Sequence, residues 1–162
     1  MPKLPSILIG AAVYVLLGLT ASVLNAMGPP ISFIAGLLSC VAILVGAMVG
    51  VWHFTNTHQL TISAGQGAGL GVSVGLVGAL ISGVLGLALI AAGVLPDPVE
   101  AAIEQARAMG QTEEQIDMAR SMTEIFAGPV GIAFGLVIGA LFGAAGGAIG
   151  AAIFKKGEPD RV

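Results

Sequence analysis

Four long stretches of this sequence carry no charged residue. They cover residues 7–24, 31–52, 63–94 and 128–154 of the 162-residue chain. A helix needs about 20 apolar residues to cross the ~30 Å hydrocarbon core of a bilayer. Each stretch approaches or exceeds that length, so we predict four membrane-spanning helices.

The composition also indicates that the chain folds in lipid rather than in water. Only 9% of the residues are charged, whereas a soluble domain carries about 25%. A water-soluble fold of this sequence would expose large apolar patches and aggregate. We therefore expect a lipid bilayer around the helices. The net charge of −3 and the lack of a basic cluster exclude a nucleic-acid partner.

Turn signals separate the four spans. Pro29 and Pro30 follow the first apolar stretch and break the helix. So short a connection predicts an antiparallel hairpin of the first two spans. The third apolar stretch is longer than a bilayer requires, so its polar start protrudes or the helix tilts. We place the spans at residues 7–26, 31–54, 63–94 and 127–154.

The first stretch could instead be a signal peptide. Its 18 uncharged residues exceed the usual apolar region of about 7–15 residues. The segment Leu24–Asn25–Ala26 also lacks the small residue that begins a cleavage site. We therefore favour a membrane span.

Residues 98–126 have a different pattern, which predicts a pair of amphipathic helices. Asp97 is placed to cap the first helix, and Gly110 to end it. Thr112 and Gln115 have the spacing of a capping box at the start of the second helix. The predicted fold is therefore an all-α membrane protein, a single domain over residues 1–162, with this insert between spans three and four.

The basic residues predict the orientation. With four spans, both termini lie on one side of the membrane, and Arg107 and Arg120 lie on the other. The positive-inside rule therefore predicts cytoplasmic termini and an outer location for residues 97–126. The terminal side carries Lys3, Lys155, Lys156 and Arg161.

Small residues recur at every fourth position in spans three and four. Positions four apart share a helix face. Because lipid tails are as apolar as leucine, helices associate in a bilayer through close packing, which small residues allow. We predict nine helix-packing residues on this basis. The first glycine ladder is Gly67, Gly71, Gly75 and Gly83, and the second glycine ladder is Gly131, Gly135, Gly139, Gly143 and Gly147.

Three uses of these ladders remain open. Spans three and four can pack on each other or on spans one and two within one subunit. One ladder can instead face outward and contact another subunit. The ladders can also line a pore, in which small residues let helices slide. Substitution of Gly75 or Gly139 by leucine should disrupt the fold or the assembly if the ladders are packing surfaces.

We find no pattern that predicts catalysis, a cofactor or a metal site. The four charge-free stretches contain no Asp, Glu, Lys, Arg or His, and an ion-driven transporter usually needs such a group within the membrane. His53 and His58 are five residues apart, which puts them on different helix faces without nearby cysteine or carboxylate ligands. Cys40 has no cysteine partner and is predicted to be a small packing residue. We therefore do not expect an enzyme.

The layout resembles a family of uncharacterised bacterial four-span membrane proteins, classed as a domain of unknown function. The likeness lies in the two-span hairpin, the Thr61–Gln66 opening of span three, and the Glu- and Met-bearing insert at residues 98–126. This chain is richer in glycine and alanine. The resemblance implies an inner-membrane location and contributes no activity and no site residues.

These observations predict a structural or accessory membrane protein that acts through helix contacts. It would work as a homo-oligomer or as a subunit of a larger membrane complex. The alternative is a channel or facilitator for a small solute, lined by serine and threonine.

Overall fold

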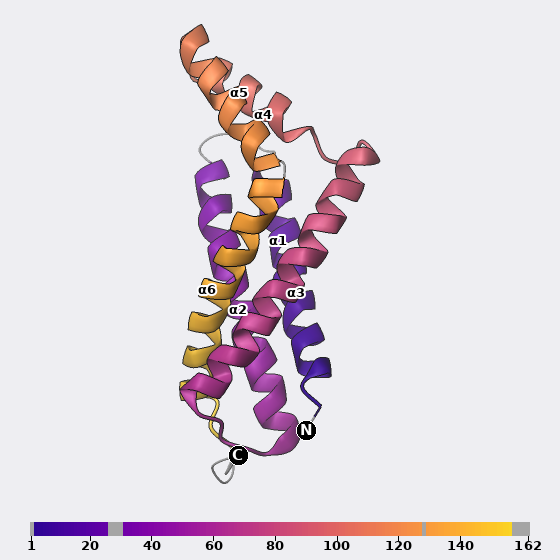
Figure 1. Cartoon of the computed structure of the whole chain (residues 1–162), viewed down its shortest axis with the longest axis vertical. Helices are drawn as coiled ribbons and strands as arrows, with labels where there is room; N and C mark the ends of the chain where they lie inside the picture. Colours follow the sequence, from indigo (N-terminus) through magenta and orange to yellow (C-terminus); the bar gives the residue numbers. More distant parts are fainter. Residues whose placement is uncertain (1, 26–30, 128, 157–162) are drawn as a thin grey trace. The chain divides into compact units, whose positions relative to one another are not determined.

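The computed structural model describes residues 2–25, 31–127 and 129–156. Its helices confirm the all-α fold, and four of them are long and apolar enough to cross a membrane. The predicted break at residues 26–30 lies outside the described residues, as do Gly128 and residues 157–162. The helices are α1 (Leu4–Asn25), α2 (Ile31–His58), α3 (Ala64–Ala91), α4 (Pro98–Ala108), α5 (Glu113–Ala127) and α6 (Pro129–Ile153) (Figure 1).

The ends of the long helices differ from the predicted spans by a few residues, for local reasons. Helix α2 continues past residue 54 to His58, where Gln59 adopts a left-handed conformation with φ of 52°. Helix α3 ends at Ala91 rather than 94, because Gly93 has a φ of 70° and turns the chain. The amide of Val94 then donates to the carbonyl of Leu89, which completes a Schellman turn.

The chain divides into two compact units, which we describe separately. The first contains α1, α2, α3 up to Ser82 and α6 from Leu136. Helices α1 and α2 pack side by side along their length. The start of α1 and the end of α2 lie at the same end of this unit, where the Ser6 hydroxyl lies 3.0 Å from His53 Nδ1.

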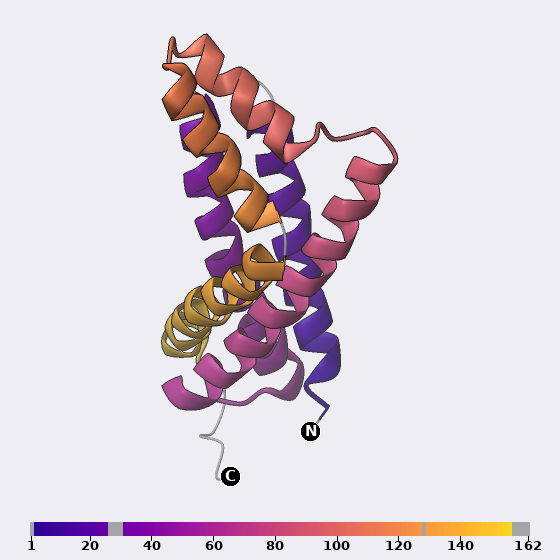
Figure 2. The ribbon, with the colours of Figure 1, turned by 45° about the horizontal axis from the view of Figure 1, so that its top comes forward.

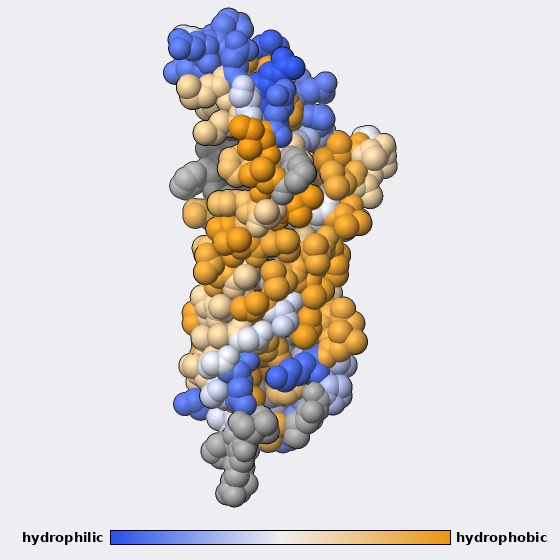
Figure 3. Space-filling view, in the orientation of Figure 1, coloured by the Kyte–Doolittle hydropathy of each residue, from blue (hydrophilic) through white to orange (hydrophobic). Residues whose placement is uncertain are grey.

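The core of the first unit is a small apolar cluster toward that end. Val51 of α2 and Val74 of α3 are completely buried. Phe54, Ile62 and Ala151 complete the cluster with Leu70, so α2, α3 and α6 all contribute to it. Large apolar side chains elsewhere on these helices point outward, which is the distribution expected in lipid (Figure 3).

The second unit covers residues 83–135. It contains the last residues of α3, the α4–α5 hairpin and the first residues of α6. Figures 1 and 2 both show α4 and α5 side by side. The predicted caps are confirmed. The carboxylate of Asp97 accepts from the amide of Val99 at 2.8 Å, and Gly110 ends α4 with a φ of 69°. Thr112 and Gln115 exchange the two bonds of a capping box.

Candidate functional site

The closest helix contact of the first unit joins α3 and α6 through glycines of both ladders. A Cβ atom built on Gly71 would overlap the carbonyl oxygen of Gly143, and one built on Gly75 would overlap that of Gly139. A Cβ on Gly147 would likewise overlap the carbonyl of Gly67. At these positions the two backbones approach so closely that even a methyl group has no room.

The remaining ladder residues lie in the second unit and do not take part in this contact. A Cβ on Gly83 or Gly135 would meet nothing within 4 Å, and one on Gly131 would overlap the carbonyl of Phe126. A geometric reason is the twist of the helix. With 3.6 residues per turn, a row of every fourth residue advances about 40° around the axis per step. Gly83 is therefore rotated about 160° from Gly67, and no straight neighbour can contact the whole row.

Other glycines also make close helix contacts that sequence reasoning did not single out. A Cβ on Gly10 of α1 would lie 2.6 Å from the carbonyl oxygen of Gly46 in α2. A Cβ on Gly146 would lie 2.6 Å from the carbonyl oxygen of Leu44, which brings α6 against α2. The four-residue spacing of Gly146 and Gly150 was a usable signal. Gly10 has no such partner in its own helix.

An aromatic side chain fills the space beside one further glycine. The ring of Tyr14 in α1 lies so close to Gly78 in α3 that a Cβ there would overlap it. A Cβ on Gly10 would also lie 3.1 Å from Val74, so Val74 and Tyr14 both connect α3 to α1. All four long helices of the first unit are therefore joined by contacts that involve at least one glycine. Packing remains a predicted role for the ladder residues, and this geometry supports it.

The polar side chains of the spans mostly bond within their own helix. The hydroxyls of Thr20, Ser22, Ser39 and Ser73 each donate to the carbonyl four residues earlier. Ser6 differs, because it is 2% exposed and pairs with His53 across α1 and α2. This pair was not predicted, because Ser6 and His53 are 47 residues apart and their contact depends on how α1 and α2 pack.

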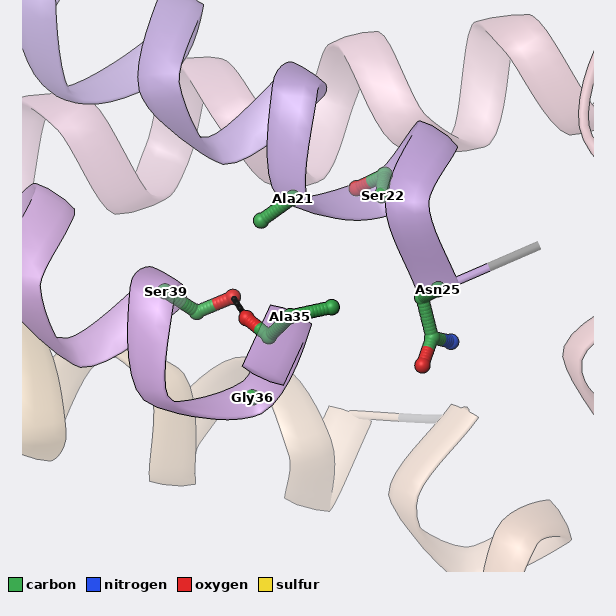
Figure 4. A pocket seen from close by; sticks show the side chains of 6 residues that line it. All are labelled: Ala21, Ser22, Asn25, Ala35, Gly36 and Ser39. Carbon is green, nitrogen blue, oxygen red and sulfur yellow. Dashed lines mark hydrogen bonds between the residues drawn. The ribbon is translucent and has the colours of Figure 1, made fainter. Parts of the chain in front are cut away.

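A cavity of about 240 Å³ opens between the second half of α1 and the first half of α2. Ala21 and Asn25 extend into it from α1 (Figure 4). Its lining carries no charge. Because its two serine hydroxyls already donate to helix carbonyls, they can only accept a further bond. The lining residues are Ala21, Ser22, Asn25, Ala35, Gly36 and Ser39.

Among the described residues, no three His, Cys, Asp or Glu side chains gather as metal ligands. The His53–Ser6 pair also has no carboxylate beside it in the first unit, because the described acidic residues belong to the second unit. The outstanding feature is thus the small-residue helix interface rather than a reactive centre.

Comparison with known proteins identifies the family of this chain. The sequence profile of a family described as protein of unknown function (DUF4199) matches residues 6–156. Neither a curated protein nor a solved structure matches the chain. The match covers all four candidate membrane helices apart from the first residues of α1. The chain is therefore a multi-pass integral membrane protein that belongs to the DUF4199 family of unknown function.

Proposed function

We propose that this protein is a structural or accessory membrane subunit that works through close helix contacts and has no catalytic activity. It would act as a homo-oligomer or within a larger membrane complex. We further propose the inner membrane, cytoplasmic termini and an outer location for the α4–α5 hairpin, on the strength of the positive-inside rule.

The observation that carries this proposal is the surplus of small residues beyond the internal contact. Three glycines, Gly83 and Gly86 of α3 and Gly135 of α6, have open space where a side chain would stand. Glycine within a helix costs roughly 0.5–1 kcal/mol relative to alanine in water. Where no neighbour in the same chain uses the close approach, contact with another membrane helix offsets that cost.

Native mass spectrometry of the protein in lipid nanodiscs tests the proposal. We expect a defined oligomer or a co-purifying membrane protein. Gly83→Leu should reduce the assembled fraction, because leucine would hold a partner helix away. Ala88→Leu is the control, because Ala88 is also exposed but lies about 140° around α3 from Gly83. A monomer without any partner would contradict the proposal.

The cavity between α1 and α2 favours a second candidate, a facilitator for a small uncharged solute. Its volume of about 240 Å³ and its hydrogen-bonding lining suit such a molecule. Flux into liposomes separates the two candidates. A facilitator predicts leakage of a small neutral solute that Gly36→Leu abolishes by filling the cavity. A structural subunit predicts none.

A further inference from the structure

Helix α5 has two apolar faces, and only one of them is covered by α4. Ile116 is 5% exposed and Ala106 of α4 is 2% exposed, so these residues mark the seam of the hairpin. The second face is a stripe of large apolar side chains that are 50–64% exposed. We call it the α5 stripe, and it consists of Met118, Met122, Ile125 and Phe126.

Four of the five charged residues of α5 lie away from the α5 stripe, and only Glu114, one turn before Met118, borders it. At 100° per residue its four members fall within an arc of about 100°. Asp117, Arg120 and Glu124 lie on the other side of the helix, where Arg120 and Glu124 form an exposed ion pair at 2.9 Å. An apolar face opposite a charged face is the pattern of a helix that lies at a membrane surface.

The α5 stripe is continuous with a surface that already contacts lipid. Only residue 128 separates α5 from α6, a membrane-crossing helix. The rings of Phe126 in the stripe and Phe134 in α6 meet edge to face, with centroids 5.6 Å apart. Phe134 is 55% exposed and Val130 is also 55% exposed, so α6 continues the apolar surface.

From this continuity we propose that the α5 stripe lies in the interfacial layer of the bilayer, with zwitterionic headgroups around it. Interfacial helices bury their apolar face about 5–10 Å into the boundary between headgroups and acyl chains. The charge of the insert selects the headgroup. Residues 97–126 carry seven carboxylates against two arginines, so an anionic lipid surface would repel them.

Spin labels on neighbouring residues of α5 test this placement in the full-length protein. The labels occupy Met118→Cys and Met122→Cys on the stripe, and Asp117→Cys and Ser121→Cys outside it, all in a Cys40→Ala background. Power-saturation measurements in phosphatidylcholine nanodiscs compare collisions with oxygen, which concentrates in lipid, and with a nickel chelate, which stays in water. All four labelled positions are exposed, so the fold should tolerate them.

We expect the oxygen-to-nickel ratio to be several-fold higher at positions 118 and 122 than at 117 and 121. Equal nickel accessibility at all four positions would overturn the proposal in favour of a solvated hairpin. Exclusion of both reagents at 118 and 122 would overturn it in favour of a covering protein. In phosphatidylglycerol nanodiscs the ratio at 122 should fall, and an unchanged or higher ratio would refute the preference for neutral headgroups.

Discussion

Replacing Gly75 by alanine adds one methyl group where α3 and α6 approach most closely. That methyl would overlap the carbonyl oxygen of Gly139, because ordinary van der Waals contact begins only near 3.4 Å. The two helices must therefore separate, and a gap of about 0.5–1 Å already removes a quarter to a half of each dispersion contact along the interface. Overpacking of this kind costs about 1–3 kcal/mol.

Alanine also has a higher helix propensity than glycine, which stabilises the protein and partly offsets the cost of overpacking. The gain relative to glycine is roughly 0.5–1 kcal/mol in water. We therefore expect Gly75→Ala to lower the free energy of unfolding by up to about 2.5 kcal/mol. At Gly69, where a Cβ meets nothing within 4 Å, the same substitution keeps the gain and should leave the stability unchanged or higher.

Titration of SDS into dodecylmaltoside micelles, followed by far-ultraviolet circular dichroism, measures both variants. The two substitutions have identical chemistry on the same helix, so their difference reports the neighbour at Gly75 alone. If Gly75→Ala unfolds at the same SDS fraction as Gly69→Ala, or at a higher one, the close approach of α3 and α6 does not exist in the protein.

Three further variants test local features. Gln59→Gly should stabilise the protein by roughly 1 kcal/mol, because glycine adopts the positive φ of this helix end without the strain of a side chain; a lower SDS midpoint would contradict this. Ser6→Ala should lower the free energy of unfolding by about 1 kcal/mol, because the hydrogen bond to His53 is lost. Ser22→Ala loses only an exposed bond within its own helix and should cost less. Equal losses of stability would contradict a special role for the Ser6–His53 pair. Asp97→Ala should weaken the first turn of α4 by about 1 kcal/mol, seen as faster amide hydrogen exchange there, and unchanged exchange would show that the cap does not matter.

Features that depend on a few neighbouring residues were predictable from the sequence. The hydroxyl of Thr112 and the amide of Gln115 meet because they belong to one helical turn, so the capping box needed no tertiary information. The membrane helices followed from length and charge alone. The end of α2 could not be predicted, because Gln59 adopts a positive φ that is unusual for glutamine.

Which glycines would contact another helix was only partly predictable. Spacing identified Gly71, Gly75 and their partners, but it could not show that the row leaves the interface before Gly83, since this depends on helix twist and crossing. The contact of Tyr14 with Gly78 was equally hidden, because it depends on which helices become neighbours. The Ser6–His53 bond links residues 47 positions apart for the same reason.

The close contact of α3 and α6 can be measured directly by solid-state NMR in lipid bilayers. Protein labelled with ¹³C at glycine Cα and alanine Cβ should show a through-space correlation between Gly67 and Ala151, because these residues face each other across the two helices. We predict that this correlation appears and that it survives dilution with unlabelled protein, since both residues belong to one chain. Its absence, together with contacts from Ala151 to lipid acyl chains, would contradict a protein held together by glycine-lined helix surfaces.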